Sequence, residues 1–318
     1  MLRNFFIYIS KANWARRIVM RWSFARITAL RFVAGESLEE AIAVARKLNK
    51  AGMNVTLDLL GEDVQTGEEA SLSVEMILNS LDQIESEKVR AGVSIKLSQL
   101  GLTIDENLCQ ANLVKILSKA AKLNSFVRID MEDSSTIDAT LRQYDLVKAA
   151  GFDNVGGVGQ AYLYRSADDV RALLENDTRI RIVKGAYQEP HDIAFAKKSD
   201  ADAEFDKLSV MLLDKALNTD IMVGMDGKYP PIAAIATHDE ARIEFAKNYA
   251  EEIGLDKNKL EFQMLYGIRR SLQQQLVEQA FPVRIYVPFG TEWFPYFMRR
   301  LAERPANLWF FVRSLIAK

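Results

Sequence analysis

The stretch that decides the fold runs from Gly92 to Asp130 and reads GVSIKLSQLGLTIDENLCQANLVKILSKAAKLNSFVRID. It begins with one short apolar run, Gly92–Lys96, and ends with another, Phe126–Asp130. Between them, Leu113–Ala121 carries apolar residues at helical spacing. A strand, a helix and a strand in this order predict two parallel strands joined by a right-handed crossover.

The same alternation continues in both directions along the chain. Eight β-like runs are found: Val55–Leu59, Gly92–Lys96, Phe126–Asp130, Val155–Gln160, Ile180–Lys184, Pro231–Thr237, Leu260–Leu265 and Val283–Pro288. Helical patterns such as Val74–Ser86 and Thr136–Ala150 lie between most of them. Eight such units are typical of a closed (β/α)8 barrel of about 250 residues. We therefore predict an α/β chain that forms a (β/α)8 barrel, distorted and preceded by an N-terminal helical arm.

An open doubly wound sheet is the alternative fold. It requires a glycine-rich phosphate loop after the first strand, but the first run here leads into Leu60-Gly61-Glu62-Asp63. The cluster Gly156-Gly157-Val158-Gly159 has the wrong spacing and lies inside a β-like run. Glycines in a strand interior indicate a bulge or the close approach of a ligand, and we expect one of these here.

Composition excludes several classes of function. The 318 residues are 49% hydrophobic and 26% charged, with a net charge of -2, which argues against a nucleic-acid-binding protein. Cys109 is the only cysteine, and His191 and His238 are the only histidines. Disulfides and Cys-cluster metal sites are therefore excluded, multi-histidine metal sites and Ser-His-Asp catalysis are disfavoured, and we predict no metal. A reducing cytoplasm is the expected compartment, since no signal peptide or membrane span is found.

Two regions differ in character, and we expect residues 1–45 to form a helical arm and 46–318 the catalytic barrel. Residues 1–32 combine seven Lys and Arg residues with several aromatic residues. Such a basic amphipathic stretch is typical of a segment that lies on an anionic membrane surface. An ordinary helical arm packed on the barrel is the competing interpretation, and the sequence leaves both open.

Polar residues gather at the carboxyl ends of the β-like runs. They are Lys96, Asp130, Gln160, Lys184, Thr237 with His238, Gln263 and Tyr286. In a barrel these ends share one face, where barrel active sites are built. A charged residue near a packed barrel mouth needs a partner or a ligand. The sequence thus predicts a binding or catalytic site at this face.

Arg181 differs from these residues because it lies in the middle of a run that should be buried. A buried guanidinium is costly unless it is paired. It could form a structural ion pair with an acid such as Asp130, or it could face a bound cofactor. We favour the cofactor, because small residues in Lys184-Gly185-Ala186 would let a large ligand approach.

A second cluster lies in the C-terminal segment. Arg299, Arg300 and Glu303 follow Tyr296 by three, four and seven residues, so they share roughly one helix face. Paired guanidinium groups bind a carboxylate bidentately. The alternative is a solvated charged surface, which the neighbouring aromatic residues Trp293, Phe294 and Phe297 make less favourable.

Several motifs resemble those of the proline dehydrogenase family, in the expected order and over about residues 54 to 310. They are Arg181-Ile182-Val183-Lys184-Gly185-Ala186-Tyr187, Val93-Ser94-Ile95-Lys96-Leu97-Ser98, Asp130-Met131-Glu132, Gln160-Ala161-Tyr162, Ala236-Thr237-His238 and Arg299-Arg300-Leu301-Ala302-Glu303. Each match is modest, but together they are specific. The chain is similar to the monofunctional bacterial type.

The resemblance implies an oxidoreductase of proline catabolism. It would oxidise L-proline to 1-pyrroline-5-carboxylate by hydride transfer from C5 to N5 of FAD, as the first step towards glutamate, and pass electrons to a quinone. A tyrosine at position 286 implies that proline is preferred to 4-hydroxyproline. Gln188 departs from the family, since many members have tryptophan there, which puts the loop after the fifth strand in doubt.

The resemblance also assigns roles to residues. Asp130 and Arg181 would be catalytic, with Arg181 near flavin N5 and Asp130 an essential acid. Lys96, Leu265, Tyr286, Tyr296, Arg299 and Arg300 would bind proline, and Glu62 would gate the site by pairing with Arg299. FAD would contact Met131, Gln160, Arg181, Val183, Lys184, Gly185, Ala186, Thr237, His238, Gln263 and Glu303.

Two other functions remain open at this point. One is a different FAD barrel, such as a relative of methylenetetrahydrofolate reductase, which would need a folate-sized cleft. The other is a non-enzymatic barrel that binds an amino acid. Neither alternative explains an arginine pair that occurs together with residues suited to hold a flavin. The absorbance of a bound flavin would distinguish either FAD enzyme from an amino-acid-binding protein.

Overall fold

The computed structural model describes residues 29–61, 64–219 and 227–303 of the chain, and in it eight parallel strands close into a barrel in chain order. The strands are β1 (Asn54–Leu59), β2 (Ala91–Ile95), β3 (Val127–Ile129), β4 (Val155–Gln160), β5 (Arg179–Val183), β6 (Ala233–Ala236), β7 (Leu260–Leu265) and β8 (Val283–Phe289). The ring closes where β1 pairs with β8. The predicted barrel is confirmed: two β-like runs coincide with observed strands, and the others differ from them by one or two residues at their ends.

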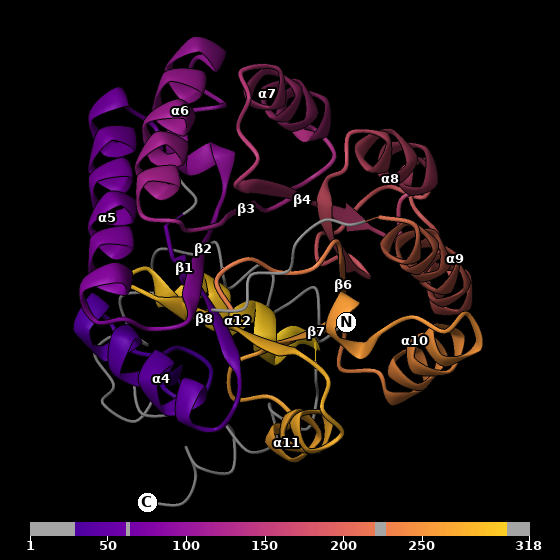
Figure 1. Ribbon diagram of the computed structural model, residues 1–318. Coiled ribbons are helices and arrows are strands. Elements are labelled where there is room, and N and C mark those ends of the chain that lie inside the picture. The colour runs from indigo at the N-terminus through magenta and orange to yellow at the C-terminus, as the bar shows by residue number, and fades with distance from the viewer. Residues whose placement is uncertain (1–28, 62–63, 220–226, 304–318) are drawn as a thin grey trace, which may run out of the picture.

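Helices follow the strands and surround them. They are α4 (Leu38–Lys50), α5 (Gly67–Ser86), α6 (Glu106–Lys122), α7 (Ile137–Ala149), α8 (Ser166–Glu175), α9 (Lys198–Leu217), α10 (Glu240–Glu252), α11 (Arg270–Glu278) and α12 (Trp293–Glu303). Two 3-10 turns, Leu97–Leu100 and Lys257–Lys259, complete the elements. Figure 1 shows α4 to α11 around the ring of strands, whereas α12 lies over the strands themselves, beside β7 and β8.

The first helix of the barrel begins at a capping box. The Ser37 hydroxyl accepts a hydrogen bond from Glu40 N, and Glu40 Oε2 accepts one from Ser37 N, so backbone donors of the first turn are satisfied. The buried residues Ala41, Ile42 and Ala45 of α4 belong to the main core. The expected domain boundary between residues 45 and 46 therefore falls inside a helix that packs on the barrel.

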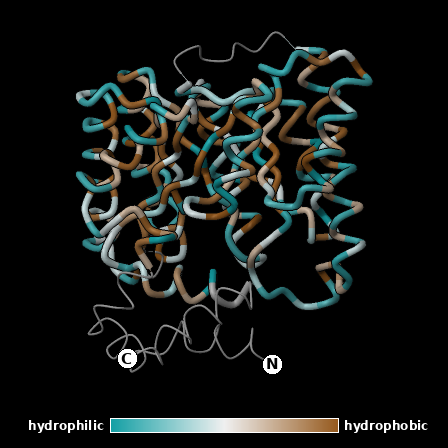
Figure 2. Tube along the Cα trace, turned by 90° about the horizontal axis from the view of Figure 1, so that it is seen from below, coloured by the Kyte–Doolittle hydropathy of each residue, from teal (hydrophilic) through white to brown (hydrophobic). Residues whose placement is uncertain are grey.

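The main hydrophobic core lies between the strands and the helices. Alternate residues of β1, Val55, Leu57 and Leu59, contribute to it, which turns Thr56 and Asp58 into the barrel interior. In Figure 2 the outer turns of the helices are mostly hydrophilic, as expected for the exposed side of such a ring. In the part of the chain that the structure describes, no helix is both long and apolar enough to cross a bilayer.

The glycine run of β4 makes room for the protein itself. A Cβ on Gly156 would lie 2.6 Å from Nη1 of Arg128, and a Cβ on Gly159 would lie 2.7 Å from Cγ2 of Val170 in α8. β4 nevertheless pairs in regular register with β5. The expected bulge is therefore wrong, and Gly156 and Gly159 make room for a buried arginine and for a close helix.

Candidate active site

Asp130, which directly follows β3, is the centre of a polar network inside the barrel. Its Oδ1 accepts a hydrogen bond of 2.5 Å from the Ser94 hydroxyl of β2 and forms an ion pair with Arg181 of β5. Its Oδ2 accepts a hydrogen bond of 2.6 Å from the Tyr286 hydroxyl of β8. Side chains from three strands therefore converge on one buried carboxylate that follows a fourth strand.

These contacts keep Asp130 ionised. Burial alone would raise the pKa of the Asp130 carboxyl, but the charges of Arg181 and Lys96 and the hydrogen bonds from Ser94 and Tyr286 hold it below its ordinary value. Burial and the neighbouring carboxylates Asp130 and Asp58 raise the pKa of the Tyr286 hydroxyl well above its ordinary value. Tyr286 is thus a hydrogen-bond donor in this network, and Asp130 is an acceptor.

Lys96 adds a second cation to the network. Its Nζ lies 2.8 Å from Oδ1 of Asp58 on β1 and 3.9 Å from Oδ2 of Asp130. The Lys96 side chain is only 8% exposed, so the charges interact away from bulk water. Lys96, Asp130, Arg181 and Tyr286, all predicted as site residues, are therefore brought into one cluster.

Arg181 forms an ion pair with Asp130, which is the structural role that the sequence analysis gave as the alternative to cofactor binding. Besides the contact with Asp130, its guanidinium lies 5.2 Å from the centroid of the Tyr286 ring. Its Nε is buried and has no hydrogen-bond partner among the residues that the structure describes. A buried donor of this kind needs a partner, so the ion pair leaves room for a ligand contact as well.

Gln160 lies at the end of β4 beside Met131. Its Nε2 donates hydrogen bonds of 3.2 Å to the carbonyl oxygens of Met131 and Glu132. Glu132 is itself anchored, since its carboxylate accepts hydrogen bonds from the backbone and hydroxyl groups of Ser98. The amide oxygen of Gln160 is buried without a partner in the described chain. The side chain is therefore held by one end and presents an acceptor at the other.

The segment after β5 is arranged differently from the expectation. Lys184 directs its ammonium to Asp202 of α9 and, at 2.7 Å, to Asp239 at the start of α10. Gly185 has a φ of +117°, and a Cβ there would collide with the Tyr162 ring. Val183 is half-buried and Ala186 is exposed. The small residue at 185 thus accommodates Tyr162, and the Lys184 side chain points to the surrounding helices.

Thr237, His238 and Leu265 are joined at the ends of β6 and β7. Nε2 of His238 accepts a hydrogen bond of 3.0 Å from Leu265 N, which places the proton of a neutral imidazole on Nδ1. The hydroxyl of Thr237 accepts a hydrogen bond from Asp239 N. These three predicted residues therefore lie near one another, with the histidine ring fixed by the backbone.

Gln263 lies inside the barrel beside Glu261 and Arg284. It is level with Arg284 in the strand register, and its Nε2 donates a hydrogen bond of 2.7 Å to Glu261. Glu261 also accepts a hydrogen bond of 2.9 Å from Nε of Arg284. These side chains form a charged floor beneath the Asp130 network, defined here as Arg128, Glu261, Gln263 and Arg284.

The predicted carboxylate clamp lies on α12. Tyr296 and Arg300 are buried, Arg299 is half-buried, and the Arg300 guanidinium lies 5.1 Å from the Tyr296 ring centroid. Trp293, Phe294 and Phe297 pack in one cluster with Leu60 and Leu265, which follow or end β1 and β7. The solvated-surface alternative is therefore wrong for this helix. Glu62 lies outside the described residues, as does the side chain of Glu303, whose backbone ends α12.

Sequence reasoning missed Asp58, and it included Ser94 and Glu132 only as parts of motifs. Each interrupts or follows an apolar strand, which was the available signal. Asp58 was overlooked because it stands inside a run, not at its end.

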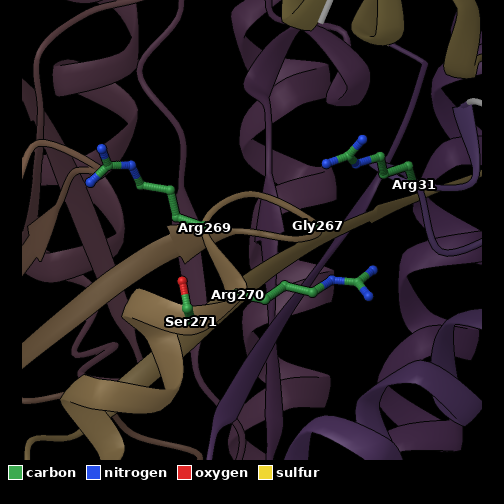
Figure 3. A pocket seen from close by; sticks show the side chains of 5 residues that line it. All are labelled: Arg31, Gly267, Arg269, Arg270 and Ser271. Carbon is green, nitrogen blue, oxygen red and sulfur yellow. The ribbon is translucent and has the colours of Figure 1, made fainter. Parts of the chain in front are cut away.

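A separate cavity of about 540 Å³ lies at the start of α11, lined by Arg31, Gly267, Arg269, Arg270 and Ser271 (Figure 3). The side chains in this cavity are exposed, apart from the buried Gly267, and Arg269 is paired with Glu240 of α10. It shares no lining residue with the Asp130 network, so we do not assign the chemistry to it.

Comparison with known proteins agrees with this geometry. The family model described as proline dehydrogenase matches residues 41–313. Proline dehydrogenase 2 of Bacillus subtilis is 38% identical over 318 residues, covering 99% of both chains. Proline dehydrogenase of Deinococcus radiodurans is 38% identical over 299 residues, covering 93% of this chain and 91% of its own.

Among solved structures, proline utilization A of Bdellovibrio bacteriovorus, inactivated by N-propargylglycine, superposes with a TM-score of 0.78 at 25% identity. The match covers 88% of this chain but only 33% of that larger protein. The fold, the ordered motifs and the full-length relatives agree, and the chain belongs to the proline dehydrogenase family of oxidoreductases.

Proposed function

We propose that this chain oxidises L-proline to 1-pyrroline-5-carboxylate with FAD as its cofactor. When bound, FAD accepts the hydride that leaves C5 of the proline ring. The observation that carries the proposal is a cluster in a chain of this family: Lys96 and Asp130, at the carboxyl ends of β2 and β3, meet Arg181 and Tyr286 from the middle of β5 and β8. Barrel enzymes build their active sites at that end.

Two buried polar atoms support a flavin at this place. The acceptor Oε1 of Gln160 and the donor Nε of Arg181 lack hydrogen-bond partners in the described chain. The edge of an isoalloxazine ring offers both an N–H donor and nitrogen and oxygen acceptors, so the two atoms fit such a ligand. Arg181 would also place a positive charge where a reduced flavin carries negative charge.

The remaining cofactor contacts are proposed from the strand ends. Met131, Gln160, Arg181, Val183, Lys184, Gly185, Ala186, Thr237, His238 and Glu303 would hold FAD. Lys184 would do so through its backbone, or after exchanging Asp202 and Asp239 for an anionic group of the ligand. Gln263 would join these contacts, with its Nε2 hydrogen-bonded to Glu261.

The substrate would be held by its carboxylate. Lys96, Arg299 and Arg300 supply cations, and bidentate contacts from arginine fix both position and orientation. Tyr286, Tyr296 and Leu265 would line the space for the ring, and Glu62 would close the site by pairing with Arg299. The proposed catalytic residues are Asp130 and Arg181, with Asp130 fixing Arg181 and Tyr286 through its two oxygens.

The electron acceptor and its location are further proposals. A quinone would take electrons from the reduced enzyme, and the basic residues 1–32 would contact the membrane surface that holds it. Most of this segment lies outside the described residues. Co-sedimentation with anionic liposomes should be stronger for the full chain than for a variant without residues 1–32, and equal pelleting would contradict the membrane contact.

The cofactor proposal is tested by absorbance. Purified protein should be yellow, and heat denaturation should release a flavin that chromatography identifies as FAD. A colourless protein that still binds proline would favour the amino-acid-binding alternative. Bound FAD that only a folate reduces would favour the methylenetetrahydrofolate reductase alternative.

A further inference from the structure

Asp58 is a buried carboxylate that none of the proposed roles uses. It lies on β1 opposite Ser94 of β2, and its side chain is 1% exposed. Its neighbours Leu57 and Leu59 pack against the helices, so strand alternation turns Asp58 into the barrel. A charge in such a position is strongly unfavourable unless an opposite charge compensates it. The partner of Asp58 therefore indicates what the residue does.

Lys96 forms an ion pair with Asp58. The ammonium lies within hydrogen-bond distance of Asp58, at 2.8 Å, and makes only a longer contact of 3.9 Å with Asp130. Lysine carries its charge on a flexible four-carbon stem, so the position of the ammonium is set by the groups that hold it. Of these two carboxylates, Asp58 makes the shorter contact.

Asp130 is engaged elsewhere. It accepts hydrogen bonds from Ser94 and Tyr286 and pairs with Arg181. The two buried carboxylates thus divide two cations between them. Asp58 makes the shorter contact with Lys96, which follows β2, and Asp130 pairs with Arg181 of β5.

We propose that Asp58 is a positioning residue for substrate binding: it fixes the Lys96 ammonium where a substrate carboxylate can meet it, and keeps it away from Asp130. This inference rests on the proposed function of Lys96. Without Asp58, the ammonium would move towards Asp130, which already lies 3.9 Å away. It would then be drawn towards a carboxylate of the protein, and its contact with a substrate carboxylate would weaken.

The test is the binding of cyclopentanecarboxylate to the holoenzyme, measured by calorimetry. This compound has the five-membered ring and the carboxylate of proline but no C–N bond to oxidise. Asp58→Asn should weaken its binding roughly ten- to a hundredfold, as expected when a binding group is displaced. Lys96→Met should weaken it to a similar extent, and the double variant should bind no more weakly than Lys96→Met alone.

The control is Thr56→Val, which changes the preceding inward-facing residue of the same strand and should bind like the wild type. The proposal would be overturned if Asp58→Asn bound cyclopentanecarboxylate as tightly as the wild type. It would also be overturned if the losses of affinity in the two single variants multiplied in the double variant. If Asp58→Asn does not fold, the double variant still tests the proposal, since it carries no unpaired buried charge from this pair, and weaker binding than that of Lys96→Met would overturn it.

Failure of this proposal is distinct from failure of the proposed function. Wild-type protein that binds the analogue but is not reduced by proline would contradict the reaction and leave the test of Asp58 intact. Wild-type protein that does not bind the analogue would overturn the role of Asp58, because no substrate carboxylate would then be met by Lys96.

Discussion

Asp130 and Arg181 form an ion pair inside the barrel, although they come from β3 and β5 and the whole of β4 lies between them. Barrel curvature and an arginine side chain are both needed to bridge that gap. Asp130 also accepts a hydrogen bond from the Tyr286 hydroxyl of β8. One carboxylate therefore fixes both the Arg181 and the Tyr286 side chains, which approach it from opposite directions. Removing it would release both at once.

Asp130→Ala should therefore reduce turnover on the order of a hundredfold or more, as for other preorganised polar groups in active sites. The measurement is steady-state oxidation of proline with an artificial electron acceptor. Asp133→Ala is the matched control, since Asp133 is exposed and its carboxylate accepts hydrogen bonds from the adjacent Ser135 among the described contacts. Equal turnover of Asp130→Ala and the wild type would remove Asp130 from the mechanism.

The same residue should make stability depend on pH. The folded protein holds the pKa of Asp130 below its ordinary value, near 3.9 in an unfolded chain, so the ionised form stabilises the fold. This contribution is fully present above about pH 4 and is lost as the pH falls through the lower folded value. The difference in unfolding free energy between the wild type and Asp130→Asn should shrink below about pH 4. A difference that is constant with pH would contradict this linkage.

The charged floor should be important for stability, not for chemistry. Arg284 and Glu261 are almost fully buried and lie 2.9 Å apart, so Arg284→Met would leave Glu261 as an uncompensated buried charge. We expect a loss of about 3–5 kcal/mol in the free energy of unfolding by denaturant. Lys115→Met breaks the exposed pair with Glu75 and should cost less than about 1 kcal/mol. If the two variants lose similar amounts of unfolding free energy, the charged floor contributes no more to stability than an exposed ion pair, and this prediction is wrong.

Arg299→Met tests the carboxylate clamp. The Michaelis constant for proline should rise roughly ten- to a hundredfold, because charge-assisted hydrogen bonds to the carboxylate are lost, while FAD stays bound. Arg270→Met, in the separate arginine-lined cavity, removes an equal charge and should leave the constant unchanged. An unchanged constant in Arg299→Met, or an equal change in both variants, would refute the clamp.

The sequence predicted the barrel because strand–helix alternation follows from local periodicity. The eight runs were placed to within one or two residues, since β-branched and apolar residues identify a buried strand without tertiary information. Polar strand ends also predicted that Lys96, Asp130 and Tyr286 would share one face, whereas Arg181 was singled out as a buried cation in the middle of a strand. Lys96, Asp130, Arg181 and Tyr286 meet there because closure of the ring brings distant strands together.

Partner choice could not be predicted in the same way. Nothing local indicates that Lys184 pairs with Asp202 and Asp239, or that Gln263 bonds to Glu261 one layer down. The role of the glycines in β4 could not be predicted either. Their role depends on Arg128 and Val170, which approach from other elements. Long-range packing decides such contacts, and the periodicity of a single strand carries no information about it.

Anaerobic reduction of the purified protein by L-proline tests the central claim most directly. With oxygen excluded, proline should bleach the flavin absorbance of the wild-type protein, and Asp130→Ala should bleach far more slowly. A flavin that keeps its full absorbance in excess proline would contradict the account, whatever the geometry of the site.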